Sequence, residues 1–543
     1  MLKKLKSYFP LLLLVLIGTV LISALFHTGY YATHDGIFHI YRTEEALSML
    51  KLGSFPLRWA GNFDQGFGIP LFTFIYPLPY YLSSVASYFV GSIWAVKLLT
   101  LVAYLLGGVG VYYFFKTPKQ KFYLPFALAL VYLMTPYQFL NIFVRGALGE
   151  ILALGLIPWV LVSFRHLEVT KKLRWYHPLP LGLLLIAHNF LGILFAVFMI
   201  GYLLFSTQNK KSAFLSLLLS FGLSAFFIVP MVSQKGYLYS TLHPDLNFRY
   251  DQHFVKLNQF IYGKWDYWYS MPPDKEDGMS FQLGVAQITL VSLSLLYTLY
   301  DIRHSKKITW YLIFAYLGSL FLMHAKSAFI WELIPILKSI QFPWRFLFMP
   351  AILTPLLAFP LLTSLSKKFL PYVLALFLIL NFVNIRNYRR PIKFFDLTEY
   401  TDLYRLYYNK TSTTFRSEIL PRWNVPAERY KSDELLINSG NMTLDSLVYN
   451  PLYINFTLNN KPDPAVAKVT LLRNYYPGWH LIMDGKTKVQ INPTDEGMIT
   501  FEPALGIHSY TLRIGSTPIE WGSNLISLFS LLSLIYVWRK SNS

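Results

Sequence analysis

Long apolar runs alternate with short basic segments along most of the chain. Several of the runs reach the roughly 20 residues that an α-helix needs to cross a bilayer. Lys and Arg gather between the runs, as in Lys116–Lys121 and Arg165–His177, and such segments tend to stay on the cytoplasmic side. The pattern predicts a polytopic α-helical protein of the cell membrane, with about twelve transmembrane helices and both termini in the cytoplasm.

The positive-inside rule also selects which runs cross the membrane. The aromatic run Leu71–Gly91 is interrupted by Pro77 and Pro79. We expect it to lie in the interface or to re-enter, because this choice places Lys116–Lys121 inside and makes the later basic loops consistent with that side. The expected crossings are then at about 8–26, 94–115, 122–134, 151–164, two short ones within 178–206, 213–232, 284–300, 309–323, 345–364, 369–385 and 521–538.

The chain changes character between about Arg386 and Pro518, where long apolar runs disappear. From Leu447 onwards, alternating strand-like runs are separated by Asp-Gly, Glu-Gly and Leu-Gly turn signals. We therefore expect an extracytoplasmic β-sandwich-like domain over 386–518, less regular in its first part to Asp445. The remaining parts of this scheme are a transmembrane domain over 1–385, with outer loops 27–93 and 233–281, and a final transmembrane helix with a short cytoplasmic tail over 519–543.

Composition supports a membrane protein and excludes several kinds of chemistry. Hydrophobic residues make up 54% of the chain and charged residues 14%, whereas soluble domains carry about 25% charged residues. The basic loops account for the net charge of +20, and no nucleic-acid-binding motif is present. The absence of cysteine rules out thiolate catalysis and cysteine metal sites. No P-loop, GxGxxG, HExxH or GxSxG motif occurs.

Charged and polar residues gather directly after the first apolar run, in the segment that contains His34, Asp35 and His39. Ionisable groups beside a membrane helix are costly unless they have a function. Asp35 is the candidate general base, because a carboxylate at the membrane surface can take a proton from a substrate hydroxyl. One alternative is that Asp35 only caps a helix that begins near Gly36. Another is that Asp35 and His39, with His34, hold a divalent cation.

Other polar residues of the opening loop receive a structural interpretation. Glu44 and Glu45 are expected on a solvated helix face, and Asp64 in a glycine-containing turn. The Trp and Tyr residues of Lys264–Ser270 could stack on a sugar ring, but an interfacial aromatic belt is their default explanation.

Further polar segments lie on the outer side of the predicted topology, and their common side predicts a single lateral cavity. Arg145 and Arg345 are the candidate phosphate ligands, because a guanidinium binds phosphate oxygens bidentately. The alternatives are snorkelling to lipid headgroups and, for Arg145, pairing with Glu150, although a spacing of five is poor for an ion pair within one helix. The residues that we predict to contact substrate are His34, His39, Glu150, His188, Asn189, Gln341 and Trp344.

Several stretches resemble known membrane proteins. An Asp just after the first span, many spans and an outer C-terminal domain resemble the GT-C superfamily of glycosyltransferases that use polyprenyl-phosphate sugars. More specifically, the chain is similar to the bacterial YfhO-like proteins and the group labelled "6-pyruvoyl-tetrahydropterin synthase-related". The stretches that carry this similarity are THDGIFHIYR, GSFPLRWAGNFDQGFGIPLFTFIYPLPYY, VRGALGEILALGLIPW, AHNFLG, QFPWRFL and YYPGWHLIMDGK.

The resemblance implies an inverting sugar transfer on the extracytoplasmic side. Asp35 would deprotonate the acceptor hydroxyl or help to bind a metal, and Arg145 or Arg345 would steady the departing lipid phosphate. Many GT-C enzymes have an acidic pair where this chain has a single Asp, so a divalent metal stays an open alternative, and no tightly bound cofactor is expected. The expected partners are membrane lipids, a lipid-linked sugar donor and a glycan, glycolipid or protein acceptor, without nucleic acid.

Two other function classes stay open. A transporter or flippase for a lipid-linked glycan would share the membrane location, but transporters often show paired repeats with broken helices at matching positions, and no such symmetry is visible in the sequence. The polar segments also gather on one predicted face instead of lining a path across the membrane. A non-catalytic scaffold for envelope assembly is the third class.

Overall fold

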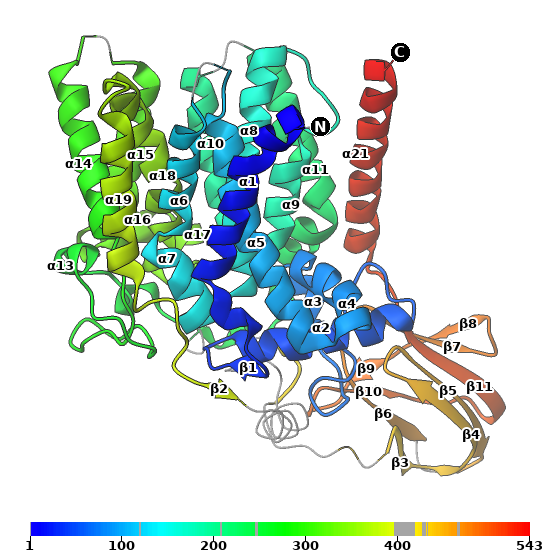
Figure 1. The fold of residues 1–543 in the computed structure, drawn as a ribbon. Helices are drawn as coiled ribbons and strands as arrows, with labels where there is room; N and C mark the ends of the chain where they lie inside the picture. Colours follow the sequence, from blue (N-terminus) through cyan, green and yellow to red (C-terminus); the bar gives the residue numbers. More distant parts are fainter. Residues whose placement is uncertain are drawn as a thin grey trace.

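The computed structural model describes residues 2–118, 121–206, 209–244, 248–303, 305–395, 419–425, 431, 433–463 and 467–542. Residues 396–418 of the segment expected to be less regular lie outside this description, as do Lys119 and Gln120 of the first basic loop. The described chain forms a helical bundle with a group of β-strands at one end (Figure 1). The N-terminal part of α1 and the C-terminal part of α21 lie at the opposite end of the bundle (Figure 1).

The bundle is built from apolar helices. Six helices of the described chain are long and apolar enough to cross a membrane, or up to eight if two bent pairs each count as one span. The expected number of about twelve is therefore not confirmed, because several apolar segments form helices of only 10–17 residues. The bundle helices are α1 (Leu2–Leu21), α5 (Ser92–Phe115), α6 (Tyr123–Leu133), α8 (Leu148–Thr170), α9 (Leu179–Ala187), α10 (Asn189–Ser206), α11 (Lys210–Ser233), α14 (Val285–Tyr300), α15 (Lys307–Met323), α18 (Phe348–Ser364), α19 (Leu370–Ile385) and α21 (Pro518–Asn542).

Of the short helices, α2, α3 and α4 lie at the end of the bundle that carries the β-strands (Figure 1). Among them, α4 has Pro79 in its first turn, where a missing backbone N–H costs nothing, and it ends at Gly91, whose φ is +78°. With 13 residues, α4 is not among the candidate crossings of the described chain. The short helices are α2 (Gly36–Lys51), α3 (Leu71–Phe74), α4 (Leu78–Val90), α7 (Pro136–Phe139), α12 (Tyr239–Leu242), α13 (Leu257–Ile261), α16 (Ala328–Leu333) and α17 (Pro335–Lys338).

Helix α8 is the most enclosed of the candidate crossings, because 83% of its apolar 18-residue stretch is buried within the protein. It packs closely against α5, since a Cβ added at Gly155 would meet the carbonyl oxygen of Ala103 at 2.4 Å. It also contacts α9. The first turn of α8 contains Glu150, so this charged residue is buried among protein groups.

A β-rich region precedes the last helix, as predicted. Its two antiparallel sheets have the strand orders β3–β6–β10–β9 and β4–β5–β11–β7–β8, and inward residues such as Ile454 and Leu471 share one buried cluster. The first strand begins at Leu435, earlier than expected. The strands are β3 (Leu435–Ser439), β4 (Asn441–Asn450), β5 (Tyr453–Lys461), β6 (Lys468–Asn474), β7 (Trp479–Met483), β8 (Thr487–Val489), β9 (Asn492–Pro493), β10 (Met498–Phe501) and β11 (Gly506–Ile514).

The opening segment of the chain connects the bundle to the β-rich region. Trp59 is buried in the hydrophobic cluster of the two sheets and meets Trp479 edge to face, with 5.5 Å between the ring centroids. Asp64 accepts a hydrogen bond from Asn474 Nδ2 at 2.7 Å, which agrees with its structural interpretation. Nearby, β1 (Tyr30–Tyr31) pairs with β2 (Phe394–Phe395), so the segment after α19 returns to the segment before α2.

The expectation of a solvated helix face is wrong for Glu45, whereas Glu44 is partly exposed. Glu45 is fully buried and accepts hydrogen bonds from the backbone and side-chain nitrogens of Asn62, at 3.0 and 2.9 Å. Glu44 accepts a hydrogen bond from Ser92 Oγ at 2.5 Å. The reason is that α2 packs against α4 and α5, while the segment with Asn62 covers another side.

Candidate functional site

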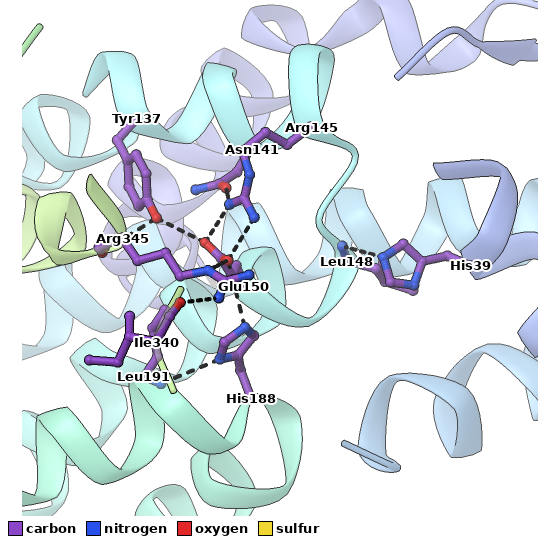
Figure 2. Close-up of polar contacts among 10 residues, drawn as sticks. All are labelled: His39, Tyr137, Asn141, Arg145, Leu148, Glu150, His188, Leu191, Ile340 and Arg345. Carbon is purple, nitrogen blue, oxygen red and sulfur yellow. Dashed lines mark hydrogen bonds and ion pairs between the residues drawn. The ribbon is translucent and has the colours of Figure 1, made fainter. Parts of the chain in front are cut away.

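A buried carboxylate, that of Glu150, is the centre of a polar cluster inside the bundle (Figure 2). Glu150 is 1% exposed. Arg145 binds both of its oxygens, with Nη1–Oε2 at 2.6 Å and Nη2–Oε1 at 2.8 Å. Arg345 Nε donates to Oε1 at 3.0 Å, and the Tyr137 hydroxyl donates to Oε2 at 2.8 Å. Both carboxylate oxygens therefore have their hydrogen-bond partners within the protein.

Arg145 and Glu150 meet because the helical backbone breaks between them. A short π-helix, Leu140–Arg145, is followed by Gly146 with a left-handed φ of +64°, and α8 begins at Leu148. The two side chains thus come from different helical segments, and the poor geometry of a spacing of five within one helix does not apply. The sequence left three explanations for Arg145: phosphate binding, snorkelling to lipid headgroups and an ion pair with Glu150. The structure shows the ion pair with Glu150. Asn141 also accepts a hydrogen bond from Arg145 Nη1, at 2.5 Å.

Arg345 enters the cluster from the short helix Pro343–Leu347. Its Nη1 donates to the carbonyl oxygen of Ile340 at 2.7 Å, so two of its three nitrogens are fixed. Its Nη2 makes no hydrogen bond within the residues that the structure describes. Trp344 lies against Arg145, with 4.5 Å from the guanidinium carbon to the ring centroid. Such a cation–π contact stabilises a guanidinium that is shielded from water.

His188 lies at the break between α9 and α10 and faces the same carboxylate. Its Nε2 is 3.6 Å from Glu150 Oε1, and its Nδ1 accepts a hydrogen bond from the backbone N–H of Leu191 at 3.3 Å. A ring nitrogen that accepts carries no hydrogen, so the imidazole is neutral and its hydrogen is on Nε2. Tyr76 stacks on the ring, with 5.0 Å between the centroids.

The cluster carries more positive than negative charge. The guanidinium groups of Arg145 and Arg345 form ion pairs with a single carboxylate, that of Glu150, and the imidazole beside it is neutral. The Asp35 carboxylate acts on Arg145 through its charge but forms no ion pair with it. The side chains of Arg145 and Arg345 are only 6% and 13% exposed, so the surplus charge is largely shielded from water. Unbalanced buried charge is costly. A bound anion with oxygen acceptors would balance it.

Asp35 lies beside this cluster. Its backbone N–H donates to the carbonyl oxygen of Arg145 at 2.8 Å. Asp35 occupies the N-cap position of α2, but its side chain makes no capping hydrogen bond; Thr33 Oγ1 accepts the hydrogen bond from the Gly36 N–H instead, at 3.1 Å. The Asp35 carboxylate is partly exposed and makes no hydrogen bond or ion pair within the described part of the chain. Helix capping therefore does not explain this carboxylate.

His39 connects Glu150's helix to α4. Its Nε2 accepts a hydrogen bond from the Leu148 N–H at 3.3 Å (Figure 2), and its Nδ1 contacts the Tyr80 hydroxyl at 2.9 Å. Arg42 Nη1 donates to the same hydroxyl at 3.3 Å. Burial, and then the positive charge of Arg42, hold the pKa of His39 well below its usual value. Since both ring nitrogens contact protein groups, His39 does not fit the predicted cation site with Asp35.

A metal site requires several ligand side chains gathered around one point. The described residues contain no group of three His, Asp or Glu side chains arranged to hold a metal ion. His34, the third residue of the predicted cation site, has its Nε2 at 3.2 Å from the carbonyl oxygen of Tyr267 and stacks on Tyr269, with 4.3 Å between the centroids. Burial lowers the pKa of His34. The neutral ring therefore joins the segment of Asp35 to the long loop after α11.

The structure brings most of the predicted residues together. Within the described residues, the side chains of Asn189 and Gln341 make no hydrogen bond to the cluster. Asn189 Nδ2 contacts the sulfur of Met231 at 3.1 Å, and Gln341 has a left-handed φ of +65°. The residues in contact are Arg145, Glu150, His188, Trp344 and Arg345, and those that border them through backbone hydrogen bonds are Asp35 and His39.

Sequence reasoning missed Tyr137, Asn141, Arg42 and Tyr80 as members of the site. Asn141 carried a usable signal, because it precedes Arg145 by four residues, which places the two side chains on one helix face. Both Tyr residues lie in apolar, aromatic stretches, where an interfacial belt is the usual explanation. The contact of the Tyr137 hydroxyl with Glu150 depends on the helix break between them, and that of the Tyr80 hydroxyl with His39 on the packing of two helices.

Comparisons with known proteins identify a family and a structural likeness. A family model described as "6-pyruvoyl-tetrahydropterin synthase related domain; membrane protein" matches residues 72–392, more than half of the chain. The crystal structure of the oligosaccharyltransferase of Archaeoglobus fulgidus in its apo form is similar, with a TM-score of 0.48 and 14% sequence identity. This likeness covers 78% of the present chain and 62% of the archaeal one. Comparison with curated proteins finds no match.

Proposed function

From the premise that this chain belongs to the family of 6-pyruvoyl-tetrahydropterin synthase related membrane proteins, we propose that it is a membrane glycosyltransferase of GT-C type. Its donor is a sugar linked to polyprenyl phosphate, and its acceptor is a glycan, glycolipid or protein of the cell envelope. The transfer takes place on the extracytoplasmic side and inverts the anomeric configuration.

A single observation carries this proposal. The Asp35 carboxylate makes no hydrogen bond or ion pair within the described chain, and it lies beside a buried cluster in which two guanidinium groups share one carboxylate. A base next to a site for an anionic leaving group is the arrangement that transfer from a phosphate-linked sugar requires. Neither part alone would suggest this reaction.

The proposed reaction is a single displacement at the anomeric carbon. The acceptor hydroxyl oxygen forms the new bond to that carbon while the bond from the carbon to the phosphate oxygen breaks. The electron pair of the broken bond leaves with the polyprenyl phosphate, and the hydroxyl proton passes to the Asp35 carboxylate. Arg145 and Arg345 stabilise the negative charge that develops on the departing phosphate oxygen.

Glu150 has a different role in this proposal. Its oxygens already accept hydrogen bonds from Arg145, Arg345 and Tyr137, so it is poorly placed to accept a proton from a substrate. It holds the two guanidinium groups in fixed positions, and the free Nη2 of Arg345 stays available to a phosphate oxygen. Glu150 is therefore a positioning residue.

The proposal is tested by exchanging Asp35 for a neutral isostere. We expect Asp35→Asn to lower sugar transfer by about 100-fold or more, the size of a general-base contribution, without a change in folding. The assay measures polyprenyl phosphate released from a panel of polyprenyl-phosphate hexoses and pentoses in the presence of envelope extract. The matched control is Asp274→Asn, which removes an exposed carboxylate from a loop. Equal activity of the two variants would overturn the assignment of Asp35 as the base.

A further inference from the structure

An open cavity of about 410 Å³ lies where α19 ends, away from the Glu150 cluster. Its place is at the end of the bundle that also carries β1 and β2 (Figure 1). The residues that line it are Tyr267, Arg386, Asn387, Arg390, Pro391 and Ile392. Two arginines, an asparagine and a tyrosine thus line one open space.

The walls of this cavity are held in place by contacts on both sides. Trp265 stacks on Tyr388, with 4.0 Å between the centroids and 12° between the planes, and the Tyr267 hydroxyl donates to the carbonyl oxygen of Arg390 at 2.6 Å. Arg389 points the other way and donates to the carbonyl oxygens at the end of α1. The segment that bears the lining cations is therefore fixed against two other parts of the chain.

The cations in the cavity have no counter-charge in the described chain. Arg386 and Arg390 are exposed and form no ion pair among the described residues. Asp266, which precedes the lining residue Tyr267 in the chain, already has partners: it pairs with Lys264 at 3.2 Å and accepts a hydrogen bond from the Tyr267 N–H at 2.8 Å. The lining is consequently positive.

The position of this charge is unusual for a membrane protein. The cavity directly follows the apolar helix α19, whose last residue is Ile385, and so lies at the level where a membrane surface is expected. On the predicted orientation this is the extracytoplasmic side, where the positive-inside rule disfavours a cluster of Arg and Lys. A ligand with negative charge supplies a reason for keeping them there.

The cavity is also connected to the segment of Asp35. The carbonyl oxygen of Tyr267 contacts His34 Nε2 at 3.2 Å, and the backbone N–H of Ala32 donates to the carbonyl oxygen of Lys393 at 3.0 Å. A ligand in the cavity would therefore lie close to the chain segment that precedes the proposed base, without occupying the Glu150 cluster.

We propose that this cavity is a second anion site, which binds a phosphate group at the membrane surface. Guanidinium groups recognise phosphate oxygens through paired, charge-assisted hydrogen bonds, and the Asn387 amide and Tyr267 ring complete a mixed polar and aromatic lining. The recognised chemistry is the phosphate group, whether it belongs to an anionic lipid headgroup or to free phosphate.

The test measures binding to the purified full chain in a neutral detergent by calorimetric titration. The probes are short-chain phosphatidic acid, inorganic phosphate and, as the zwitterionic comparison, short-chain phosphatidylcholine. We expect Arg386→Gln and Arg390→Gln each to weaken phosphatidic acid binding by about tenfold. Arg303→Gln, which also removes an exposed charge, from the loop between α14 and α15, should leave phosphatidic acid binding unchanged. Asn387→Asp, which adds a negative charge to the lining, should also weaken binding, whereas Asn387→Gln should not.

The outcomes separate the two sources of phosphate. If inorganic phosphate binds and competes with phosphatidic acid, the cavity recognises the phosphate itself; if only the lipid binds, the headgroup at a membrane is the ligand. Failure of the wild type to bind either probe overturns the proposal, as does equal binding by Arg390→Gln and Arg303→Gln. Unchanged melting temperatures exclude misfolding as the cause of lost binding. Because no sugar transfer is measured, the result is independent of the proposed glycosyltransferase reaction.

Discussion

The backbone N–H of Asp35 donates a hydrogen bond to the carbonyl oxygen of Arg145 at 2.8 Å. This contact joins the proposed base to the proposed leaving-group site, although the two residues are far apart in the sequence. It also places α2 and the break before α8 in one rigid unit, since a Cβ on Gly146 would meet Thr33 Oγ1 at 2.3 Å. The relative position of the two functional parts is thus set by backbone packing.

The first prediction separates the cap of α2 from the base. Thr33→Val removes the oxygen that accepts the Gly36 N–H and should lower the free energy of unfolding by about 1 kcal/mol. Asp35→Asn should leave stability unchanged, because its side chain caps nothing. Thermal unfolding in detergent measures both effects. If Asp35→Asn destabilises the protein as much as Thr33→Val does, the carboxylate has a structural role after all.

A second prediction concerns Gly146. Gly146→Ala is expected to disturb both functional parts, because the added Cβ would also lie 3.0 Å from the Gly36 nitrogen. Gly53→Ala is the matched control: Gly53 also has a positive φ, of +81°, but nothing lies within 4 Å of an added Cβ. Both variants carry the left-handed penalty of about 1–2 kcal/mol, so a larger loss of stability and transfer is expected only in Gly146→Ala. Similar behaviour of the two variants would argue against close packing at this point.

The third prediction is that removal of the Glu150 charge destabilises the bundle. Glu150→Gln leaves two guanidinium groups without their carboxylate in a buried place, and loss of one partner from a buried ion pair costs about 3–5 kcal/mol. Glu332→Gln is the control, because Glu332 pairs with Lys338 at an exposed position, where an ion pair contributes about 0–1 kcal/mol. The two melting temperatures should differ clearly. A small effect in Glu150→Gln would mean that the cluster is more accessible to water than its burial indicates.

The fourth prediction assigns Arg345 to donor binding. Arg345→Ala should raise the KM for the polyprenyl-phosphate sugar more than the KM for the acceptor, since the free Nη2 is the available phosphate contact. Arg345→Lys should not restore the wild-type value, because a single ammonium cannot reproduce the planar fork that reaches Glu150 and Ile340 together. Steady-state kinetics with each substrate varied in turn provides the measurement. An unchanged donor KM in both variants would contradict the assignment.

A fifth prediction concerns orientation, and it uses the absence of cysteine from the chain. A cysteine placed at Asp274 should react with a membrane-impermeant maleimide in intact cells. A cysteine at Arg303, in the loop between α14 and α15 at the opposite end of the bundle (Figure 1), should react only after permeabilisation. The reverse labelling pattern would place the candidate site in the cytoplasm and would exclude a donor from the outer leaflet.

The amino-acid sequence by itself determined the class of protein and much of the candidate chemistry. Long apolar runs with few charges can be stable only in a membrane or a buried core, and alternating runs with Gly turns before the last helix predicted the β-rich region. The short motifs around Asp35, Arg145, His188 and Arg345 were recognisable because charged residues are rare in such a chain. The family inferred from them is confirmed by the match over residues 72–392.

Only the tertiary structure decided how these residues are used. Apolar periodicity does not distinguish a helix that faces lipid from one that is enclosed by protein. The sequence pattern could therefore not predict the number of crossings or the burial of Glu45. The ion pairs of Glu150 join Arg145 across a helix break and Arg345 across nearly 200 positions of sequence. Coulomb attraction and hydrogen bonding depend on the distance between atoms in space, which must be a few ångströms. The number of residues between two positions in the sequence does not give this distance.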